Sequence, residues 1–170
     1  MDRRIIKPTV RVYDVKDDKL ELIGIVNKTT SIIWKRVWST YGDFELHMGE
    51  PNALLKNGRF VMVNDDVNKF GIIEKPVDDS DGFAYNSTQD FTVHGYTADF
   101  ILSQRITIPS DSDNKNHDGY MVWDNTPAET IMYDLVDQHV VNPTDSNRKI
   151  PLITIAKHGT PTEHKLSFQS

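Results

Sequence analysis

Short alternating strands separated by turn residues occupy the first hundred residues, and this pattern restricts the possible fold more than any other feature. "VRVYDV" alternates valines with other residues, and "KLELIGIV" follows after a short Asp17–Asp18 turn, which predicts a β-hairpin. Similar strand segments with turn residues between them continue to about Tyr96. Such a succession predicts a closed or nearly closed antiparallel barrel, in which closure would also hide the strand edges.

Two consecutive strands of this series carry the candidate functional residues, within "SIIWKRVWSTYGDFELHM". Side chains alternate between the faces of a strand. This predicts Ile32, Trp34, Arg36 and Trp38 on one face of the first strand, and Phe44, Leu46 and Met48 on one face of the second. The possible interface or packing residues are Trp34, Arg36, Trp38, Tyr41 and Phe44.

Two interpretations of the tryptophans stay open. In the first, Trp34 and Trp38 pack within the barrel or at a domain interface, and Arg36 is exposed or stacks between them as a cation–π partner. In the second, the aromatic rings form an exposed platform for sugar rings.

Beyond Thr97 the pattern mixes helices and strands. "TADFILSQR" predicts a short helix and "RITIP" a short strand, and "SDSDNKNHDGYMVWDN" reads as a polar loop. "TPAETIMYDLVDQHV" predicts a helix with Thr126 as N-cap, Pro127 at the first position and Glu129 closing a capping box. Its apolar stripe has helical spacing and consists of Ile131, Met132, Leu135, Val136 and Val140. Asn142–Pro143 is expected to end the helix.

The chain is predicted to be mainly β (α+β). An antiparallel β-barrel-like domain is expected over residues 1–97, and a smaller α+β segment with one well-capped helix over residues 98–170. "PNALLKNG" adds a single helical turn to the first domain, and "KIPLITIA" and "HKLSFQS" add strands to the second. Because the chain stops within an expected strand, we expect an N-terminal fragment, truncated at its C-terminal end.

Composition and charge exclude several classes of protein. The chain has no cysteine, which excludes disulfides, thiolate metal sites and a cysteine nucleophile. It lacks an apolar run long enough to span a bilayer. Its net charge of −6 and pI of about 5.4 argue against specific nucleic-acid binding, which usually needs a basic face.

The charge is unevenly distributed along the chain. Residues 1–40 hold nine lysines and arginines against five acids, whereas the rest hold ten against twenty. The first part therefore carries +4 and the second −10. This difference is either a chance feature of a solvated surface or a sign of electrostatic complementarity between neighbouring copies or partners.

The sequence predicts no catalytic, cofactor-binding or metal-binding residues. It has no Gly-rich phosphate loop and no nucleophile-elbow motif, and its six histidines lack the spacing of metal ligands. "DSDNKNHDG" is similar to a calcium loop, but Lys115, Asn116 and Val122 stand where a ligand, a glycine and an acid are needed. A polar loop is therefore favoured over a calcium site.

The order of the motifs resembles the N-terminal, baseplate-hub-like region of siphophage tail-tip hub proteins, the family that includes tail-associated lysins. The segments that carry the resemblance are "YGDFELHM", "GIIEKP", "HGYTADFILSQRI" and "PAETIMYDLVDQHVVNP…RKIP", and they cover nearly the whole chain. Family members often carry a longer Gly-rich loop where this chain has "SDSDNKNHDGYMVWDN", so contacts made by that loop cannot be transferred.

The resemblance implies a structural role in a phage or prophage virion. It implies a homo-oligomer, a trimer in the assembled tail, that closes the tail tube beside the distal tail protein and the tail tube or tape measure proteins. The protein would be made in the bacterial host cytoplasm and reside at the tail tip of the virion. It would not be an enzyme, because any lytic domain would lie downstream. The alternative is a carbohydrate- or receptor-binding β module of a phage tail or cell surface.

Overall fold

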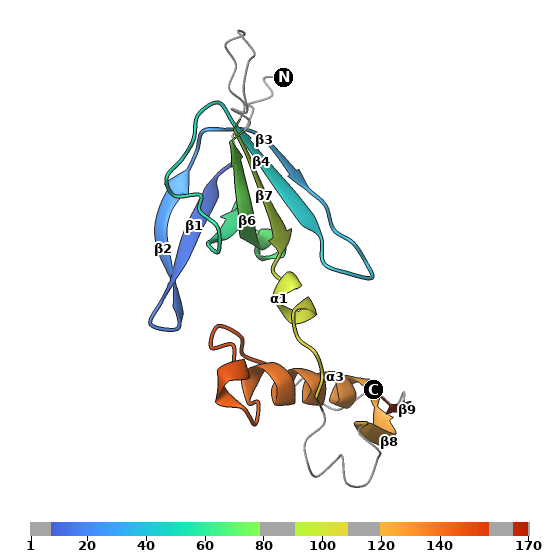
Figure 1. Ribbon diagram of the computed structural model, residues 1–170. Coiled ribbons are helices and arrows are strands. Elements are labelled where there is room, and N and C mark those ends of the chain that lie inside the picture. The colour runs from blue at the N-terminus through green and yellow to red at the C-terminus, as the bar shows by residue number, and fades with distance from the viewer. Residues whose placement is uncertain (1–7, 79–90, 109–119, 157–164, 170) are drawn as a thin grey trace. The chain divides into compact units, whose positions relative to one another are not determined.

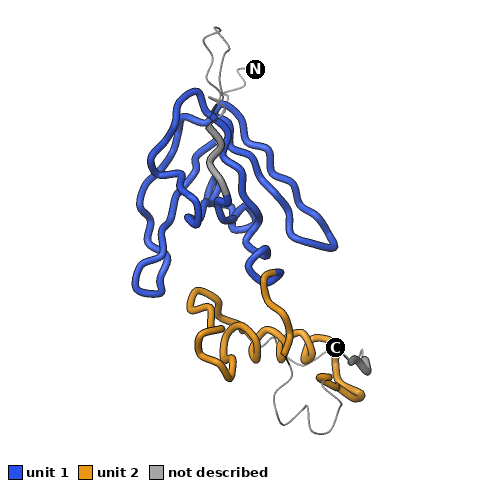
Figure 2. Tube along the Cα trace, viewed as in Figure 1, with its two compact units in different colours: residues 1–103 blue, residues 104–170 orange. Residues whose placement is uncertain are grey.

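The computed structural model describes residues 8–78, 91–108, 120–156 and 165–169, and the chain divides into two compact units (Figure 2). These units are residues 1–103 and 104–170. The sequence placed the boundary after Thr97, whereas the first unit also includes helix α1 (Phe100–Ser103). The helix belongs there because the ring of Phe100 stacks on Tyr96, with 4.5 Å between the ring centroids.

The antiparallel strands that the sequence predicted form a seven-stranded sheet in the first unit, which among the described residues is open rather than closed into a barrel. Its strands are β1 (Val10–Lys16), β2 (Lys19–Val26), β3 (Thr29–Trp34), β4 (Asp43–Met48), β5 (Phe60–Val63), β6 (Phe70–Asp78) and β7 (Phe91–Thr97). They are hydrogen-bonded in the order β2-β1-β5-β6-β7-β4-β3. No ladder joins β2 to β3 among the described residues, so these two strands are the edges of the sheet. Figure 1 shows the β1–β2 hairpin and the β3–β4 pair diverging on either side of β6 and β7.

The turn between β1 and β2 sets the register of the first hairpin. Asp17 and Asp18 have φ values of 48° and 60°, and Lys16 pairs with Lys19 across the two-residue loop. Positive φ at both central residues defines the turn whose twist matches that of antiparallel strands. The resulting register places Val10 and Val12 on the inner face, where both are fully buried.

The core lies on the inner face of the sheet. Phe44, Leu46 and Met48 are all buried, which confirms the predicted face of the second aromatic strand. Ile32 and Trp34 pack against this core from β3. The remaining members of the cluster are Val10, Val12, Val26, Leu55, Val61, Val63, Ile73 and Val93.

Phe44 occupies a notch that two glycines leave open in the sheet. Phe44 lies opposite Gly95 on β7, and a Cβ atom at Gly95 would overlap the Phe44 ring and the carbonyl oxygen of Ile72. A Cβ at Gly71 would lie 2.7 Å from the same ring and 2.5 Å from the carbonyl oxygen of Tyr96. These distances are below van der Waals contact, so the ring fits only because both positions lack a side chain.

The segment between β4 and β5 was predicted to include a helical turn, and this prediction was wrong. Residues 53–54 and 57–58 form turns, and the Leu55 amide donates to the carbonyl of Asn52 at 3.0 Å. Arg59 fixes the segment, because its guanidinium donates to Asp14 at 2.9 Å and to the Leu54 carbonyl at 3.0 Å. These contacts hold Leu55 in the core without a helix.

The described residues of the second unit form a helical segment, a short 3₁₀ helix and a two-stranded sheet. Helix α3 (Ala128–Val136) continues into a π-helical turn, η2 (Asp137–Val141), and ends at Asn142 as expected. Strand β8 (Val122–Pro127) pairs antiparallel with β9 (Lys165–Gln169). The expected strand at "HKLSFQS" is therefore confirmed, whereas the end of the expected polar loop is a strand. Two short 3₁₀ helices complete the described elements: η1 (Val67–Lys69) in the first unit and η3 (Ser146–Arg148) in the second.

The predicted capping of this helix was wrong. Pro127 is the N-cap, with no side-chain hydrogen bond to the first turn. Thr126 belongs instead to β8, where it pairs with Leu166 and donates its hydroxyl to the carbonyl of Asp124. Thr126, which the local sequence assigned to the helix cap, is therefore part of the β8–β9 ladder.

Two further expected strands do not form. Residues 105–108 and 149–156 lie outside any strand. Both stretches contribute other backbone contacts, because Arg148 donates to the carbonyl of Ile106 at 2.6 Å and the Ile150 amide donates to Val140 at 2.9 Å. The alternating apolar pattern was not sufficient for strand formation, because neither stretch pairs with a strand among the described residues.

His139 is buried in the helical segment of the second unit. Only 6% of the residue is exposed, and its Nε2 lies 3.2 Å from the sulfur of Met121. Burial, and to a smaller extent the positive charge of Arg148, lowers the pKa of His139 below its usual value. His139 lies in the last turn of the helical segment, where the helix dipole by itself would favour its charged form, so burial has the larger effect on its pKa.

The Gly95→Ala substitution is expected to lower the free energy of unfolding by about 1–3 kcal/mol, because the added methyl overpacks the notch that holds Phe44. Gly49→Ala is the matched control, since no atom lies within 4 Å of a Cβ at Gly49. Urea unfolding of both variants measures the difference. Equal stability of the two variants would contradict the notch.

The second unit is expected to lose stability as the pH falls through about 6.5, the usual pKa of histidine. Because folding lowers the pKa of His139, the unfolded state binds more protons there as the pH falls, and acid favours unfolding. This contribution is absent above that pH. Comparing the unfolding of the wild type and His139→Gln from pH 7.5 to 5.5 isolates it, and an identical pH dependence would contradict the assignment.

Candidate functional site

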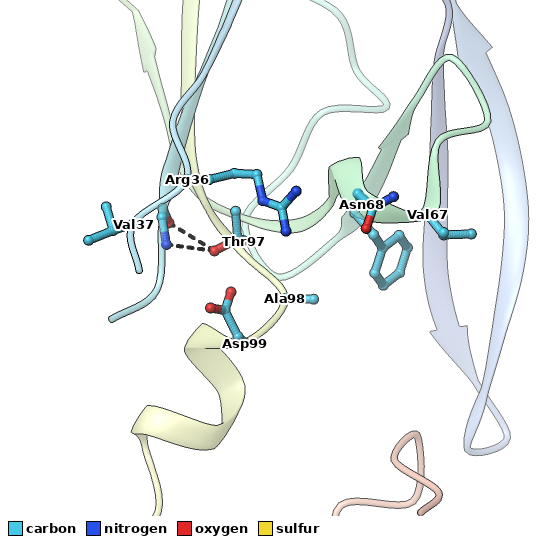
Figure 3. A pocket seen from close by; sticks show the side chains of 9 residues that line it. Arg36, Val37, Val67, Asn68, Thr97, Ala98 and Asp99 are labelled. Carbon is cyan, nitrogen blue, oxygen red and sulfur yellow. Dashed lines mark hydrogen bonds between the residues drawn. The ribbon is translucent and has the colours of Figure 1, made fainter. Parts of the chain in front are cut away.

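A pocket of about 260 Å³ lies at one end of the sheet, where the chain leaves β3 and β7. Figure 3 shows Arg36 extending over it towards Thr97 and Asn68, with Asp99 below. Segments far apart in the sequence contribute its lining, which consists of Arg36, Val37, Gly42, Val67, Asn68, Phe70, Thr97, Ala98 and Asp99.

Hydrogen bonds between Gly42 and Thr97 form the rigid base of the pocket. The Gly42 amide donates to Thr97 Oγ1 at 2.7 Å, and this hydroxyl donates to the Gly42 carbonyl at 3.2 Å. The Thr97 amide also donates to the Gly42 carbonyl, at 3.0 Å. A Cβ at Gly42 would overlap the carbonyl oxygen of Lys35. The 35–42 loop is therefore anchored at both of its ends, because Lys35 also donates its amide to Asp43 at 2.9 Å.

Arg36 provides the positive charge of the pocket. Asp66, beside the pocket, accepts hydrogen bonds from the amide and the side chain of Asn68 at 3.0 and 3.1 Å. These bonds lower the pKa of Asp66, with small contributions from Lys69 and Arg36. No ion pair joins Arg36 to an acid in the part of the chain that the structure describes, so its guanidinium is available to a carboxylate or another acceptor on a partner.

The structure separates the two tryptophans that the sequence placed on one face. Strand β3 ends at Trp34, and the chain beyond it forms the anchored loop. Trp38 is fully exposed, at 104% of its reference area, and Arg36 points to the pocket (Figure 3). The strand alternation therefore does not continue to Trp38, and packing inside this chain applies to Trp34 only.

Trp34 and Phe44 form a stacked pair at the edge of the core. The strand pairing places them opposite each other, and their ring centroids are 4.8 Å apart with an angle of 5° between the planes. The indole nitrogen of Trp34 is buried and has no hydrogen-bond partner among the described residues. The pair therefore stabilises the sheet by apolar contact alone.

Tyr41 joins a second aromatic group that also holds α1. Its ring meets Tyr96 at 5.1 Å and Phe100 at 4.9 Å, both edge to face. These contacts give Tyr41 a packing role, on the opposite side of β7 from the core because Tyr96 and Gly95 are consecutive strand residues.

One polar cluster was missed by the sequence reasoning. On the outer face, Glu45 lies 3.3 Å from His47 Nε2 and 4.0 Å from His94 Nδ1, and His47 Nδ1 lies 3.2 Å from Thr92 Oγ1. The spacing Glu-x-His in a strand places Glu45 and His47 on one face, and it could have indicated this pair. It could not have indicated His94 and Thr92, which lie on β7. Within the described ranges, no group of three or more histidines and acids could hold a metal ion. The calcium-like segment 111–119 lies outside the described residues.

The fold and the pocket define a β-rich module with stacked aromatic side chains, a pocket lined by Arg36, and two sheet edges among the described residues. Residues 9–169 match the family model described as the siphovirus ReqiPepy6 Gp37-like protein. The chain therefore belongs to this siphovirus family, which confirms the phage origin that the motif order implied. No curated protein and no solved structure matches the chain. None of the helices in the described ranges has the length and apolar character needed to cross a membrane.

The two tryptophans are expected to respond differently to truncation. Trp34→Ala removes a ring stacked on the core and should lower the free energy of unfolding by about 3 kcal/mol. Trp38→Ala removes an exposed ring and should change it by less than about 0.5 kcal/mol. Urea unfolding at one protein concentration measures both, and a large loss for Trp38→Ala in a monomer would contradict its exposure.

Proposed function

We propose that this chain is the hub-like region of a siphophage tail-tip protein, a structural component of the virion that closes the tail tube and assembles as a ring of three copies. Its membership of a siphovirus family over residues 9–169 carries the proposal. The hub role comes from the resemblance of its motif order to that of tail-tip hub proteins.

The open sheet supports a role in assembly. Strands β2 and β3 each have a neighbour on one side only among the described residues. Proteins protect such edges against backbone pairing with devices that include bulges, and both strands carry one, at Ile23 and Thr30, where the register shifts. A contact between copies at these edges would therefore be made by side chains. The bulges hinder uncontrolled strand addition, and they leave the outer side chains available for a specific contact.

In this proposal the partners are other copies of the chain, the distal tail protein, and the tail tube or tape measure proteins. The module acts by binding and by shape, and any lytic activity would belong to a segment downstream of it. The protein would be made in the host cytoplasm and function at the tail tip.

A carbohydrate- or receptor-binding module is the second candidate, and one observation favours it. Trp38 is fully exposed, and it follows pocket residues Arg36 and Val37 in the chain. An exposed ring beside a polar pocket suits a sugar, which combines an apolar face with hydroxyl groups. This candidate expects glycan binding that Trp38→Ala removes without unfolding the protein.

The mass of the full chain in solution tests the proposed hub. Light scattering coupled to size exclusion, over a wide concentration range, should show a species of three chains. A glycan array with the wild type and Trp38→Ala serves as the control for the second candidate. A monomer at every concentration, together with glycan binding that depends on Trp38, would contradict the hub proposal.

A further inference from the structure

We propose that two exposed apolar surfaces on opposite edges of the sheet bind each other between neighbouring copies of this chain. The hairpin patch consists of Val15, Leu20, Leu22 and Ile25 on β1 and β2. The loop patch consists of residues 35–38, which follow β3. This inference rests on the proposed ring and names the surfaces that would form it.

The strand register places the hairpin patch on one face. Val15 pairs with Leu20 and Tyr13 pairs with Leu22, and directly opposite residues share a face. Ile25 pairs with Arg11 on the same outer face, because the bulge at Ile23 restores the alternation. The four apolar side chains are 43%, 37%, 47% and 47% exposed, so they form an uncovered apolar area next to Arg11 on the outer face of this hairpin.

The loop patch lies beyond the other edge strand. Val37 is 46% exposed and Trp38 is fully exposed, and both lie in the loop that the Gly42–Thr97 hydrogen bonds anchor. An anchored loop loses little conformational entropy when it binds. Exposed tryptophan and arginine side chains are also those that most often dominate the energy of protein interfaces.

Unlike charges accompany the two patches. Asp17 and Asp18 form the tip of the hairpin, and neither makes an ion pair within the described ranges. Arg36 in the loop patch is likewise without an ion pair there. By contrast, several basic residues of the first forty are paired within the sheet: Arg11 with Asp65, Lys16 with Glu21, Lys28 with Glu50, and Lys35 with Asp43. Lys19, beside the two aspartates, has no ion pair among the described residues, so the unpaired side chains of the hairpin tip sum to one negative charge. The loop patch keeps the positive charge of Arg36, which shares the pocket lining with Asp99.

This arrangement selects a second copy as the occupant and a head-to-tail contact as its geometry. A hairpin patch facing another hairpin patch would bring acidic tips together, and two loop patches would bring arginines together, which is unfavourable. Hairpin patch against loop patch pairs unlike charges. Because the two surfaces are different, each copy keeps one of each free for its neighbours, and the contact repeats until a ring closes.

The absence of cysteine from the sequence allows a cross-linking test with unique thiols. Full-length Leu22→Cys and Ser39→Cys proteins, the second of which keeps the neighbouring Trp38, are mixed and treated with a short bismaleimide. They should give a covalent dimer in several-fold excess over either protein alone. Met132→Cys, at a 67% exposed position outside both patches, replaces either partner as the control and should give only background. Cross-linking of each variant mainly to itself would overturn the head-to-tail contact.

Charge reversal tests the same contact without a cross-link. Asp17→Lys with Asp18→Lys, or Arg36→Glu alone, should weaken association about tenfold, and mixing the two variants should restore it between them only. Lys56→Glu, an exposed change outside both patches, should have no effect. Sedimentation velocity measures each mixture. A trimer that ignores all these changes would overturn the proposed surfaces and leave the proposed hub intact, whereas a wild type that neither associates nor cross-links would overturn both.

Discussion

The fit of the Phe44 ring into the notch left by Gly71 and Gly95 is the contact on which the first unit depends. The ring touches β6 and β7 through the two glycine positions, and Trp34 on β3 stacks on it. One side chain thus joins four strands of the sheet. Because interiors are packed as densely as organic crystals, neither a smaller ring nor a larger neighbour would preserve this junction.

Sequence alternation predicted the parts of this fold that depend on local pattern. The faces of Phe44, Leu46 and Met48, and the hairpin at Asp17–Asp18, followed from spacing and turn residues alone. The end of β3 did not, because it is set by Gly42 and Thr97, which meet across 55 residues of sequence. The cap of α3 failed for the same reason: Thr126 has a local preference for capping, but its partner on β9 lies about forty residues later.

The candidate site, too, combines residues that a local pattern indicated with residues that come from distant segments of the chain. Arg36 was recognised from the tryptophans around it, and the structure places it at a pocket. Val37 and Gly42 belong to the same loop as Arg36, but the other lining residues come from η1, the start of β6 and the end of β7. No local pattern connects these segments to Arg36. Trp38 was assigned to a strand face because regular alternation was extended past the residue where hydrogen bonding to β4 ends.

The core of the first unit is complete without the exposed apolar residues. Phe44, Leu46, Val10 and Val12 are fully buried within one copy, so the free energy gained by burying Leu22 or Trp38 is not used in folding that copy. Burial of apolar area gains roughly 25 cal/mol per Å², and association must first offset the lost freedom of two molecules. An anchored loop and a short two-residue turn reduce that cost, because both surfaces are already held in shape. In the proposed ring, the apolar side chains that folding leaves exposed would be buried between copies.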